Sequence, residues 1–396
     1  MSAPGRGLSV GGWPLHGGQP GPLLARFGLD ETTPVLDVSA NLNPLGPPAW
    51  LHEWLNSRLA EAGALARYPD PDYREAREAI AAHEGVAPEQ VLLTNGGAEA
   101  VFLAAALQAR ERPGAPAAIV EPTFAEYARA CAAQGLPAVT LPLTPPDFRL
   151  DVEAIAAGLG EARLLWLCRP NNPTATLVPR AEVERLLALT AARGCRLVVD
   201  EAFVDFIGDE GGQGENKEAL TPLLADYPHL LLLRSLTKQF TLPGLRLGYL
   251  LGAPEAVAAA RACQPAWSVN ALAAALVAPL LADRDFQAAT RAWLAAERPR
   301  LRAGLEALGL AVVPSHANFF LVRHPAGREA TRNLLPALLR RGVLARHTEG
   351  FAGLDGGWLR LALGSASSNA RLLAGLGDAL GDMADMADIA RPEVRR

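Results

Sequence analysis

The stretch that decides the fold reads Ser235-Leu-Thr-Lys238 and, after four intervening residues, Pro243-Gly-Leu-Arg246-Leu-Gly. An apolar run, Leu230–Leu233, lies just before it and predicts a buried strand. Lys238 is therefore expected just beyond the carboxyl end of a strand, at the edge where open α/β sheets bind ligands. A lysine after a strand is most often a solvated surface residue, so its meaning depends on what the neighbouring strands present.

Three further predicted strands also end in polar residues or glycines. They are Arg196–Val199 before Asp200, Leu164–Cys168 before Asn171 and Asn172, and Val91–Thr94 before Asn95-Gly-Gly97-Ala98. Because the carboxyl ends of parallel strands lie at one edge of a sheet, we expect these groups to meet Lys238 there. If these polar residues and glycines served only the fold, their presence at the end of each strand would be a coincidence repeated at every strand.

Short apolar runs alternate with alanine-rich helical stretches over most of residues 75–275. This alternation predicts βαβ units and an α/β fold with a mainly parallel central sheet flanked by helices. A different pattern follows and predicts a smaller α+β domain. It comprises a helical stretch at 271–308, an apolar run at Phe319–Val322, a helix near 328–341, a strand at Trp358–Leu363 and a helix near 368–386.

The chain has 396 residues, more than one core usually supports. We predict an N-terminal arm over residues 1–45, a large domain over 46–275 and a small domain over 276–396. The arm is rich in glycine and proline, so we expect it to be irregular and to join the small domain.

The composition argues against several classes of function. A net charge of −5 without a basic run gives no reason to expect nucleic acid, and no apolar run reaches the roughly 18 residues of a membrane span. The cysteines Cys131, Cys168, Cys195 and Cys263 lie far apart, which argues against a zinc site or a disulfide framework. The N-terminus lacks the apolar core of a signal peptide. We therefore expect a cytoplasmic protein without a metal.

The residue types at the strand ends match the requirements of pyridoxal 5′-phosphate (PLP). A lysine amine forms a Schiff base with this cofactor, and a carboxylate keeps its pyridinium nitrogen protonated, so that the ring acts as an electron sink. A side-chain donor must hold the phenolic oxygen of the ring. The phosphate favours a helix N-terminus with small residues, together with hydroxyls and an arginine. The predicted strand ends supply the lysine, the carboxylate, the amide and the small residues, and an arginine lies in Pro243-Gly-Leu-Arg246.

These motifs resemble those of the aspartate-aminotransferase-like PLP enzymes, the fold type I group, and the order of helices and strands agrees over nearly the whole chain. The resemblance implies that Lys238 is the Schiff-base lysine, that Asp200 pairs with the ring nitrogen and that Asn172 donates to the ring oxygen. It also implies a set of residues around the rest of the cofactor: Gly97, Ala98, Ser235, Thr237 and Arg246 at the phosphate, and Phe124 stacked on the ring.

The resemblance extends to a partner subunit and to the substrate. Tyr68, in Arg67-Tyr-Pro, would reach the phosphate from the neighbouring subunit, which implies a homodimer with shared active sites. Arg360, in Trp358-Leu-Arg-Leu, corresponds to the arginine that binds the substrate carboxylate, an anion that suits its bidentate guanidinium. The family motif Asn-Pro-Thr-Gly has Ala175 in place of glycine, a departure that bears on the local turn.

Within the family, the chain most resembles the histidinol-phosphate aminotransferases and the related threonine-phosphate decarboxylases of cobalamin synthesis. The segments that favour the decarboxylases are His16-Gly-Gly, Asp37-Val-Ser-Ala-Asn41, Arg67-Tyr-Pro-Asp-Pro-Asp-Tyr73, Trp267-Ser-Val-Asn270 and Gly353-Leu-Asp355. The aminotransferases usually have tyrosine where this chain has Phe203, and its hydroxyl donates to the ring oxygen. With Phe203 that donor is absent, which allows a reaction different from that of the aminotransferases.

The motifs leave the reaction open, because PLP enzymes select it by the bond at Cα that stands perpendicular to the ring. We expect decarboxylation of O-phospho-L-threonine to (R)-1-aminopropan-2-yl phosphate and CO2. The alternative is a histidinol-phosphate aminotransferase or related aminotransferase that uses 2-oxoglutarate. A third possibility is a regulatory protein of this fold without turnover. Such a protein would be free to lose Lys238, so the presence of this lysine argues against it.

Substrate selection is predicted to lie with four residues: His16, Asn41, Arg346 and Arg360. Arg346, in Leu344-Ala-Arg-His, matches a position where phosphate-handling relatives have an arginine. Two arginines suit a small substrate that carries both a phosphate and a carboxylate, and the assignment of each anion to an arginine stays open. His16, in a glycine-rich segment, would close over the phosphate.

Overall fold

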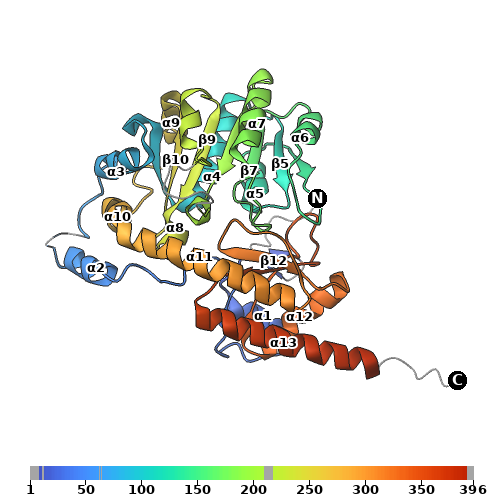
Figure 1. The fold of residues 1–396 in the computed structure, drawn as a ribbon. Coiled ribbons are helices and arrows are strands. Elements are labelled where there is room, and N and C mark those ends of the chain that lie inside the picture. The colour runs from blue at the N-terminus through green and yellow to red at the C-terminus, as the bar shows by residue number, and fades with distance from the viewer. Residues whose placement is uncertain (1–8, 11–12, 62, 64, 209–216, 390–396) are drawn as a thin grey trace.

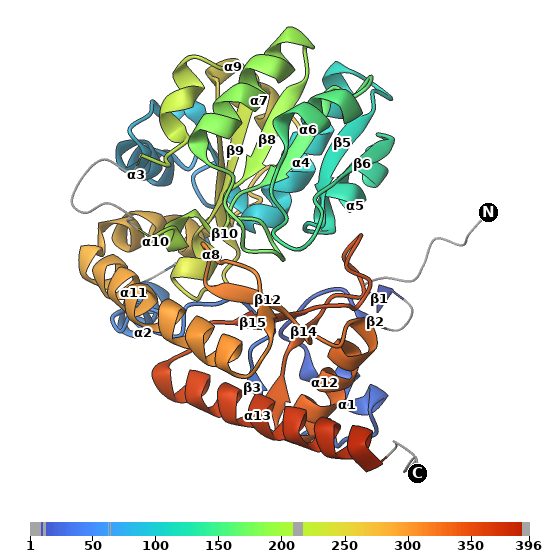
Figure 2. The ribbon, with the colours of Figure 1, turned by 45° about the vertical axis from the view of Figure 1, so that its right-hand side comes forward.

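A computed structural model describes residues 9–10, 13–61, 63, 65–208 and 217–389. It confirms the predicted α/β fold, with a mainly parallel sheet of seven strands in one body and an antiparallel sheet of four strands in the other. We call these the large-sheet body and the small-sheet body. They lie one above the other in Figures 1 and 2.

The large sheet has the strand order β4-β10-β9-β8-β7-β5-β6. Its strands are β4 (Val91–Asn95), β5 (Ala117–Glu121), β6 (Ala138–Pro142), β7 (Leu164–Cys168), β8 (Arg196–Asp200), β9 (Leu230–Ser235) and β10 (Leu247–Gly252). The strands from β9 to β6 run parallel, whereas β10 is antiparallel to both of its neighbours. Strand β6 was not predicted, because it is an edge strand of which only Leu141 is buried.

Helices cover both faces of this sheet, as Figure 1 shows. One face carries α4 (Gly96–Glu111), α5 (Glu126–Ala133) and α9 (Pro254–Arg261), and the other carries α3 (Arg74–Glu84), α6 (Val152–Gly158), α7 (Arg180–Ala192) and α10 (Ala271–Ala282). Successive strand residues point to opposite faces, so that Leu92 and Leu93 enter different cores. Both faces are apolar, which explains why the strands read as continuous apolar runs.

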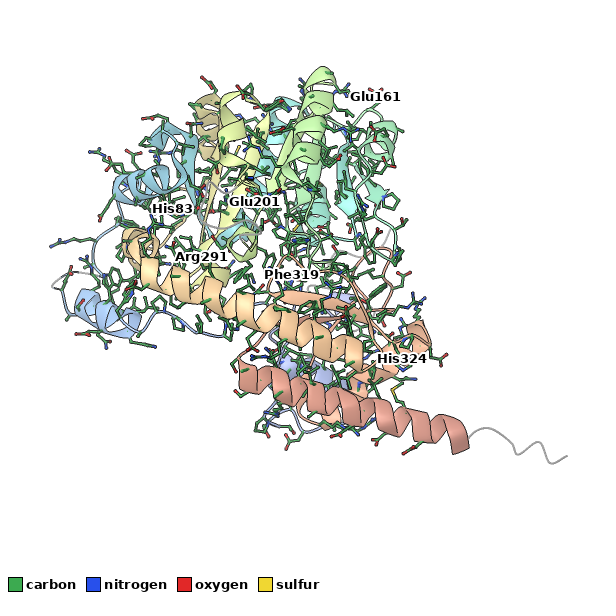
Figure 3. All side chains as sticks on the ribbon, viewed as in Figure 1. His83, Glu161, Glu201, Arg291, Phe319 and His324 are labelled. Carbon is green, nitrogen blue, oxygen red and sulfur yellow. The ribbon has the colours of Figure 1, made fainter. Side chains whose placement is uncertain are left out.

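The small sheet has the order β11-β12-β15-β14. The strands of this body are β11 (Ala311–Val312), β12 (Phe319–Arg323), β13 (Val343–Leu344), β14 (Arg346–His347) and β15 (Leu359–Ala362), and its helices are α11 (Arg284–Ala307), α12 (Arg328–Arg340) and α13 (Ala366–Ile389). Phe319, labelled in Figure 3, lies on β12. Helix α13 packs beside α11 and α12 on the outer side of this body (Figure 2).

The N-terminal arm is more regular than predicted. It contains β1 (Ser9–Val10), β2 (Trp13–Pro14), α1 (Pro20–Arg26) and β3 (Leu36–Asp37). Helix α1 begins with proline and buries Leu23 and Leu24, but its few residues carry too little periodicity to be found among glycines and prolines. Strand β3 pairs in parallel with β13 of the small-sheet body. Residues 1–8 and 11–12 of the arm lie outside the described residues, and the predicted domain boundaries stay predictions.

The helical stretch predicted over 271–308 is divided into α10 and α11. The carboxylate of Asp283 accepts a 2.9 Å hydrogen bond from the amide of Phe286 and caps α11. The unpredicted helix α2 (Leu51–Ala60) has only Leu51 buried. No helix in the described ranges combines the length and the apolar character needed to cross a membrane.

Candidate active site

The predicted strand ends meet in a pocket of about 440 Å³ at the carboxyl edge of the large sheet. All of the predicted site residues except Thr237 and Tyr68 line it. Those lining it are His16, Asn41, Gly97, Ala98, Phe124, Asn172, Asp200, Ser235, Lys238, Arg246, Arg346 and Arg360. They come from the arm, the large-sheet body and the small-sheet body, so the pocket lies where the three meet.

Lys238 lies in the short helix α8 (Leu236–Gln239), which directly follows β9. Burial lowers the pKa of its amine from 10.5 to about 8, and the nearby guanidinium groups of Arg360 and Arg246 add to this effect. The carboxylate of Asp200 opposes the shift. A lysine with a lowered pKa holds more of the neutral amine, the form that attacks a carbonyl carbon.

Asp200 is the last residue of β8 and is buried. Its Oδ2 accepts a 2.7 Å hydrogen bond from the hydroxyl of Tyr127, and its Oδ1 accepts a 2.9 Å bond from the amide of Ala202. Burial raises the pKa of Asp200, while the Tyr127 hydroxyl, the Ala202 amide and the Lys238 charge work in the opposite direction. The carboxylate is thus held in one orientation in the pocket.

Buried ion pairs link the strand ends beside Asp200. The carboxylate of Glu201, labelled in Figure 3, lies 3.2 Å from Arg169 and 3.2 Å from Arg234. These residues stand at the ends of three neighbouring strands, β7, β8 and β9. Since removing one partner leaves a buried charge uncompensated, the network holds the strand ends in register.

The N-terminus of α4 forms one end of the pocket, next to the guanidinium of Arg246. Gly96 has φ of 76°, and a Cβ built there would lie 2.6 Å from Nη2 of Arg246. Gly248 allows a similar close approach, because its Cβ would lie 2.8 Å from the amide nitrogen of Gly97. Free helix amides, a guanidinium and small residues form a site that favours a phosphate. Neither Gly96 nor Gly248 was predicted as a site residue.

Thr237 does not line the pocket. Its hydroxyl lies 2.7 Å from the hydroxyl of Ser235, which does line it. Thr237 is therefore placed to orient Ser235.

The side chain of Asn172 is oriented by Arg360. Nη1 of Arg360 donates to Oδ1 of Asn172 at 2.5 Å, and Nη2 donates to the carbonyl of Ser39 at 2.6 Å. The Nδ2 amide of Asn172 has no hydrogen-bond partner among the described residues and remains available as a donor. Ala175 closes the adjacent turn with φ of 61°, so the turn forms with alanine at a position that favours glycine.

Phe203 lies against the pocket with its ring 5.9 Å from Nζ of Lys238. It packs edge to face on Phe319, with the ring centroids 5.0 Å apart. No hydroxyl stands at this position, and the surroundings of the ring are apolar. Asn172 is consequently the side-chain amide donor that this part of the pocket supplies.

Arg346 joins the arm to the small-sheet body. Nη1 donates to the carbonyl of Pro14 at 2.8 Å and Nη2 to the carbonyl of Leu15 at 2.5 Å. The next arm residue, His16, reaches the large-sheet body, where its Nε2 lies 3.2 Å from the carboxylate of Glu126. The arm therefore crosses the pocket opening from one body to the other.

Asn41 is buried in the pocket wall. Its Oδ1 has no hydrogen-bond partner in the part of the chain that the structure describes, and neither has Nε of Arg360. A buried polar atom without a partner is costly unless a ligand or water satisfies it. Both atoms therefore point to a polar ligand.

Several residues that line the pocket were not predicted. They are Leu15, Gly17, Ser39, Ala40, Glu126, Tyr127, Arg129, Cys168, Ala202 and Phe351. Glu126 and Tyr127 follow Phe124 within one turn of a predicted helix, but the sequence does not show which positions of that helix face the pocket. Phe351 carries no chemical signal in the sequence.

Tyr68 lies outside the pocket of its own chain. Its side chain is 79% exposed, and its ring lies on that of Trp267 with the centroids 4.5 Å apart. Trp267 is itself 45% exposed. A role of Tyr68 in the pocket of a second subunit stays a prediction.

Comparison with known proteins agrees with the geometry of the pocket. The model of the aminotransferase class I and II family matches residues 33–376. The threonine-phosphate decarboxylase of Salmonella typhimurium is 39% identical over 350 residues, which are 87% of this chain and 91% of that protein. The histidinol-phosphate aminotransferase of Methylibium petroleiphilum is 35% identical over 377 residues, 91% of this chain and 97% of that protein.

A solved structure shows the same architecture. That of histidinol-phosphate aminotransferase from Clostridium acetobutylicum superposes with a TM-score of 0.78 at 26% identity, over 87% of this chain and 99% of the other. The family match covers most of the chain and includes the strand ends that line the pocket. The chain therefore belongs to the aminotransferase class I and II family, whose cofactor is pyridoxal 5′-phosphate.

Proposed function

We propose that this chain decarboxylates O-phospho-L-threonine to (R)-1-aminopropan-2-yl phosphate and CO2 in the cytoplasm, for the corrin side chain of cobalamin. The 39% identity to a threonine-phosphate decarboxylase supports this reaction. The aminotransferase relative at 35% identity keeps a second reaction open. The residues of the pocket favour the decarboxylation.

The observation that carries the proposal is a pair of buried arginines without carboxylate partners. Arg346 is 3% and Arg360 is 6% exposed, and neither forms an ion pair within the described residues. Burial lowers the pKa of Arg346 to about 10 and that of Arg360 to about 9. Both remain cationic at neutral pH. The carboxylate of Asp37 offsets part of the Arg360 charge, and a buried charge without an ion-pair partner is costly. O-phospho-L-threonine offers a phosphate and a carboxylate to these two cations in one molecule. In the aminotransferase alternative, histidinol phosphate offers only its phosphate, and the two carboxylates of 2-oxoglutarate would have to use the same pair.

The residues present fit the cofactor. Lys238 would hold it as a Schiff base, Asp200 would pair with the ring nitrogen, and Nδ2 of Asn172 would donate to the ring oxygen. A further set would surround the phosphate and the ring: Gly97, Ala98, Ser235 and Arg246 at the phosphate, with Thr237 orienting Ser235, and Phe124 on the ring. When bound, PLP supplies an electron sink for the charge that CO2 leaves on Cα of the substrate.

The chain itself orients the substrate and supplies a proton. Arg360 and Arg346 would hold the two anions so that the Cα–carboxylate bond stands across the ring, the geometry that selects this bond. His16 and Asn41 would complete the contacts to the phosphate end. As CO2 leaves, one proton must replace it at Cα, and Nζ of Lys238, with its pKa near 8, can carry that proton.

The absence of a hydroxyl at Phe203 supports a reaction different from that of enzymes with tyrosine at this position. Asn172 would be the donor to the ring oxygen on this side, so the cofactor is held differently from that of an enzyme with tyrosine there. Transamination with 2-oxoglutarate would use the same lysine, and it is the second candidate because several relatives are aminotransferases.

The homodimer also belongs to the proposal. Tyr68 and Trp267 form an exposed aromatic pair, and Leu65 nearby in the sequence is 78% exposed. Exposed aromatic clusters of this kind are typical of protein interfaces. We place a second copy of the chain on this surface, with Tyr68 reaching the partner's cofactor phosphate.

The arginine pair is tested by comparing phosphorylated and unphosphorylated substrates. R346A and R360A should each weaken binding of O-phospho-L-threonine by about tenfold or more, as expected for loss of a charged hydrogen bond. L-threonine lacks the phosphate, so its weaker binding should respond to only one of the two substitutions. Unchanged affinity of R346A for O-phospho-L-threonine would contradict the proposed role of that arginine.

A further inference from the structure

The arm contacts helix α5 where it crosses the pocket opening. Residues 14–18 make this crossing, with the carbonyls of Pro14 and Leu15 bound by Arg346. Gly17 lies so close to the chain that a Cβ there would stand 2.2 Å from the carbonyl oxygen of Ser39. The amide of Gly18 donates to the Ser39 hydroxyl at 2.8 Å. The backbone on both sides of His16 is therefore fixed.

The side chain of His16 is directed by Glu126. Nε2 of His16 lies 3.2 Å from Oε1 of Glu126, and the two rings of His16 and Phe124 have centroids 6.1 Å apart. Nδ1 of His16 has no hydrogen-bond partner among the residues that the structure describes. His16, Glu126 and Phe124 all line the pocket. One ring nitrogen is thus engaged by the protein, and the other is available to a ligand.

Glu126 is ionised and itself firmly placed. Its side chain is 7% exposed, and Nη1 of Arg129 donates to both of its oxygens at 2.6 and 2.7 Å. Burial would raise the pKa of Glu126, but the bonds from His16 and Arg129 outweigh burial and lower it. The Glu126 carboxylate faces Nε2 of His16, so Nδ1 is the ring nitrogen left to donate to a ligand when it carries a proton.

We propose that Glu126 is a positioning residue for substrate binding, which holds His16 over the pocket so that Nδ1 of the ring donates to the phosphate of the substrate. The inference rests on the proposed function in one respect, namely that the substrate carries a phosphate. Glu126 itself does not touch the phosphate, because two anions in contact would repel each other. Its effect on binding therefore passes through His16.

The test uses a ligand that binds without being decarboxylated. O-phosphoethanolamine has the amine and the phosphate of the substrate but no carboxylate. Its Kd is measured by calorimetry on PLP-loaded protein for the wild type, H16A, E126Q, E126D and the double variant H16A/E126Q. We expect H16A and E126Q each to weaken binding by about tenfold, the effect of one charge-assisted hydrogen bond. E126D, which keeps the carboxylate, should recover part of the loss.

The double variant separates a positioning role from an independent one. If Glu126 acts through His16, H16A/E126Q should bind no more weakly than H16A alone, because the two residues are coupled. The control is E182Q, since Glu182 lies in the first turn of α7 and pairs with Arg185 three residues on, at 2.9 Å, away from the pocket. It should bind as the wild type does.

The possible outcomes test three claims separately: the role of Glu126, the contact of His16 with the phosphate, and the proposed reaction. Wild-type affinity in E126Q, or additive losses in the double variant, would overturn the role of Glu126. Wild-type affinity in H16A would remove both this role and the proposed contact of His16 with the phosphate. Coupled losses in a protein that does not release CO2 from O-phospho-L-threonine would keep Glu126 as a positioning residue and refute the proposed reaction. The visible absorbance of the loaded variants should match the wild type, since Glu126 does not contact the cofactor.

Discussion

The hydroxyl of Tyr127 donates a 2.7 Å hydrogen bond to Oδ2 of Asp200 inside the pocket. The Tyr127 ring stacks on Trp166, with the centroids 5.0 Å apart and the planes inclined by 4°. Burial and the charge of Asp200 raise the pKa of Tyr127 well above its ordinary range, so the hydroxyl keeps its proton. Tyr127 is thus a fixed donor to the carboxylate that we assign to the ring nitrogen of the cofactor.

Replacing Tyr127 with phenylalanine removes this donor and keeps the ring stack. Because the Tyr127 hydroxyl lowers the pKa of Asp200 against the effect of burial, we expect that pKa to rise in Y127F. The acidic limb of the kcat profile should move to higher pH, and kcat should fall about tenfold, as for loss of one hydrogen bond to a charged group. A kcat–pH profile that coincides with the wild type would refute the coupling.

The lowered pKa of Lys238 predicts how pH affects the stability of the cofactor-free protein. Between the folded value near 8 and the ordinary value of 10.5, the unfolded chain binds a proton that the folded chain does not. The free energy of unfolding should therefore rise with pH through this window, and the charged amine should lower it below about pH 8. K238M should be more stable than the wild type at pH 7, by up to about 3 kcal/mol, with the difference shrinking towards pH 10.

Urea unfolding of the cofactor-free proteins at several pH values measures this difference. K217M provides the control, since Lys217 is the other lysine of the chain and is exposed. A K238M protein that is no more stable than the wild type at pH 7 would show that the amine is solvated in the folded chain.

Restoring a hydroxyl at Phe203 should alter the environment of the cofactor. In F203Y, a second donor to the phenolic oxygen would stabilise its anionic form, so the visible absorbance of the loaded protein should titrate at lower pH. Decarboxylation should become slower, because the ring is then held as in enzymes with tyrosine at this position. F203L is the matched control without a hydroxyl. Equal titration curves for F203Y and F203L would show that position 203 does not reach the ring oxygen.

Mixed dimers test the shared active site. K238A and Y68A homodimers should each have little activity, since every site lacks one of the two groups. In a mixture that exchanges subunits at random, half of the dimers are mixed and each has one intact site. Activity should therefore return to about a quarter of the wild type. If mixing restores nothing while native mass spectrometry shows the mixed dimers, Tyr68 does not serve the partner subunit.

The pocket residues that follow strands could be predicted, because a strand end has a fixed place in a parallel sheet. Lys238, Asp200 and Asn172 follow runs of apolar residues whose boundaries in the sequence agree closely with β9, β8 and β7. Once the sheet is parallel, their proximity follows from topology. The residue types then limit the choice of cofactor, because few cofactors need a lysine, a carboxylate and an amide together.

Other parts of the site carried too little local signal. Glu126 and Tyr127 lie in a helix, where any position on the inner face could reach the pocket, and only the packing of α5 on the sheet decides which does. The contact of His16 with Glu126 joins residues far apart in the chain, and no periodicity predicts such a contact. Strand β6 and helix α1 were missed because one is largely exposed and the other has only two buried residues.

The measurement that tests the central claim most directly is product release from O-phospho-L-threonine by PLP-loaded protein without any keto acid. We predict CO2 and aminopropanol phosphate in equal amounts, over many turnovers, and none from K238A. No CO2, but glutamate formed from histidinol phosphate and 2-oxoglutarate, would contradict the decarboxylase and establish an aminotransferase on the same pocket.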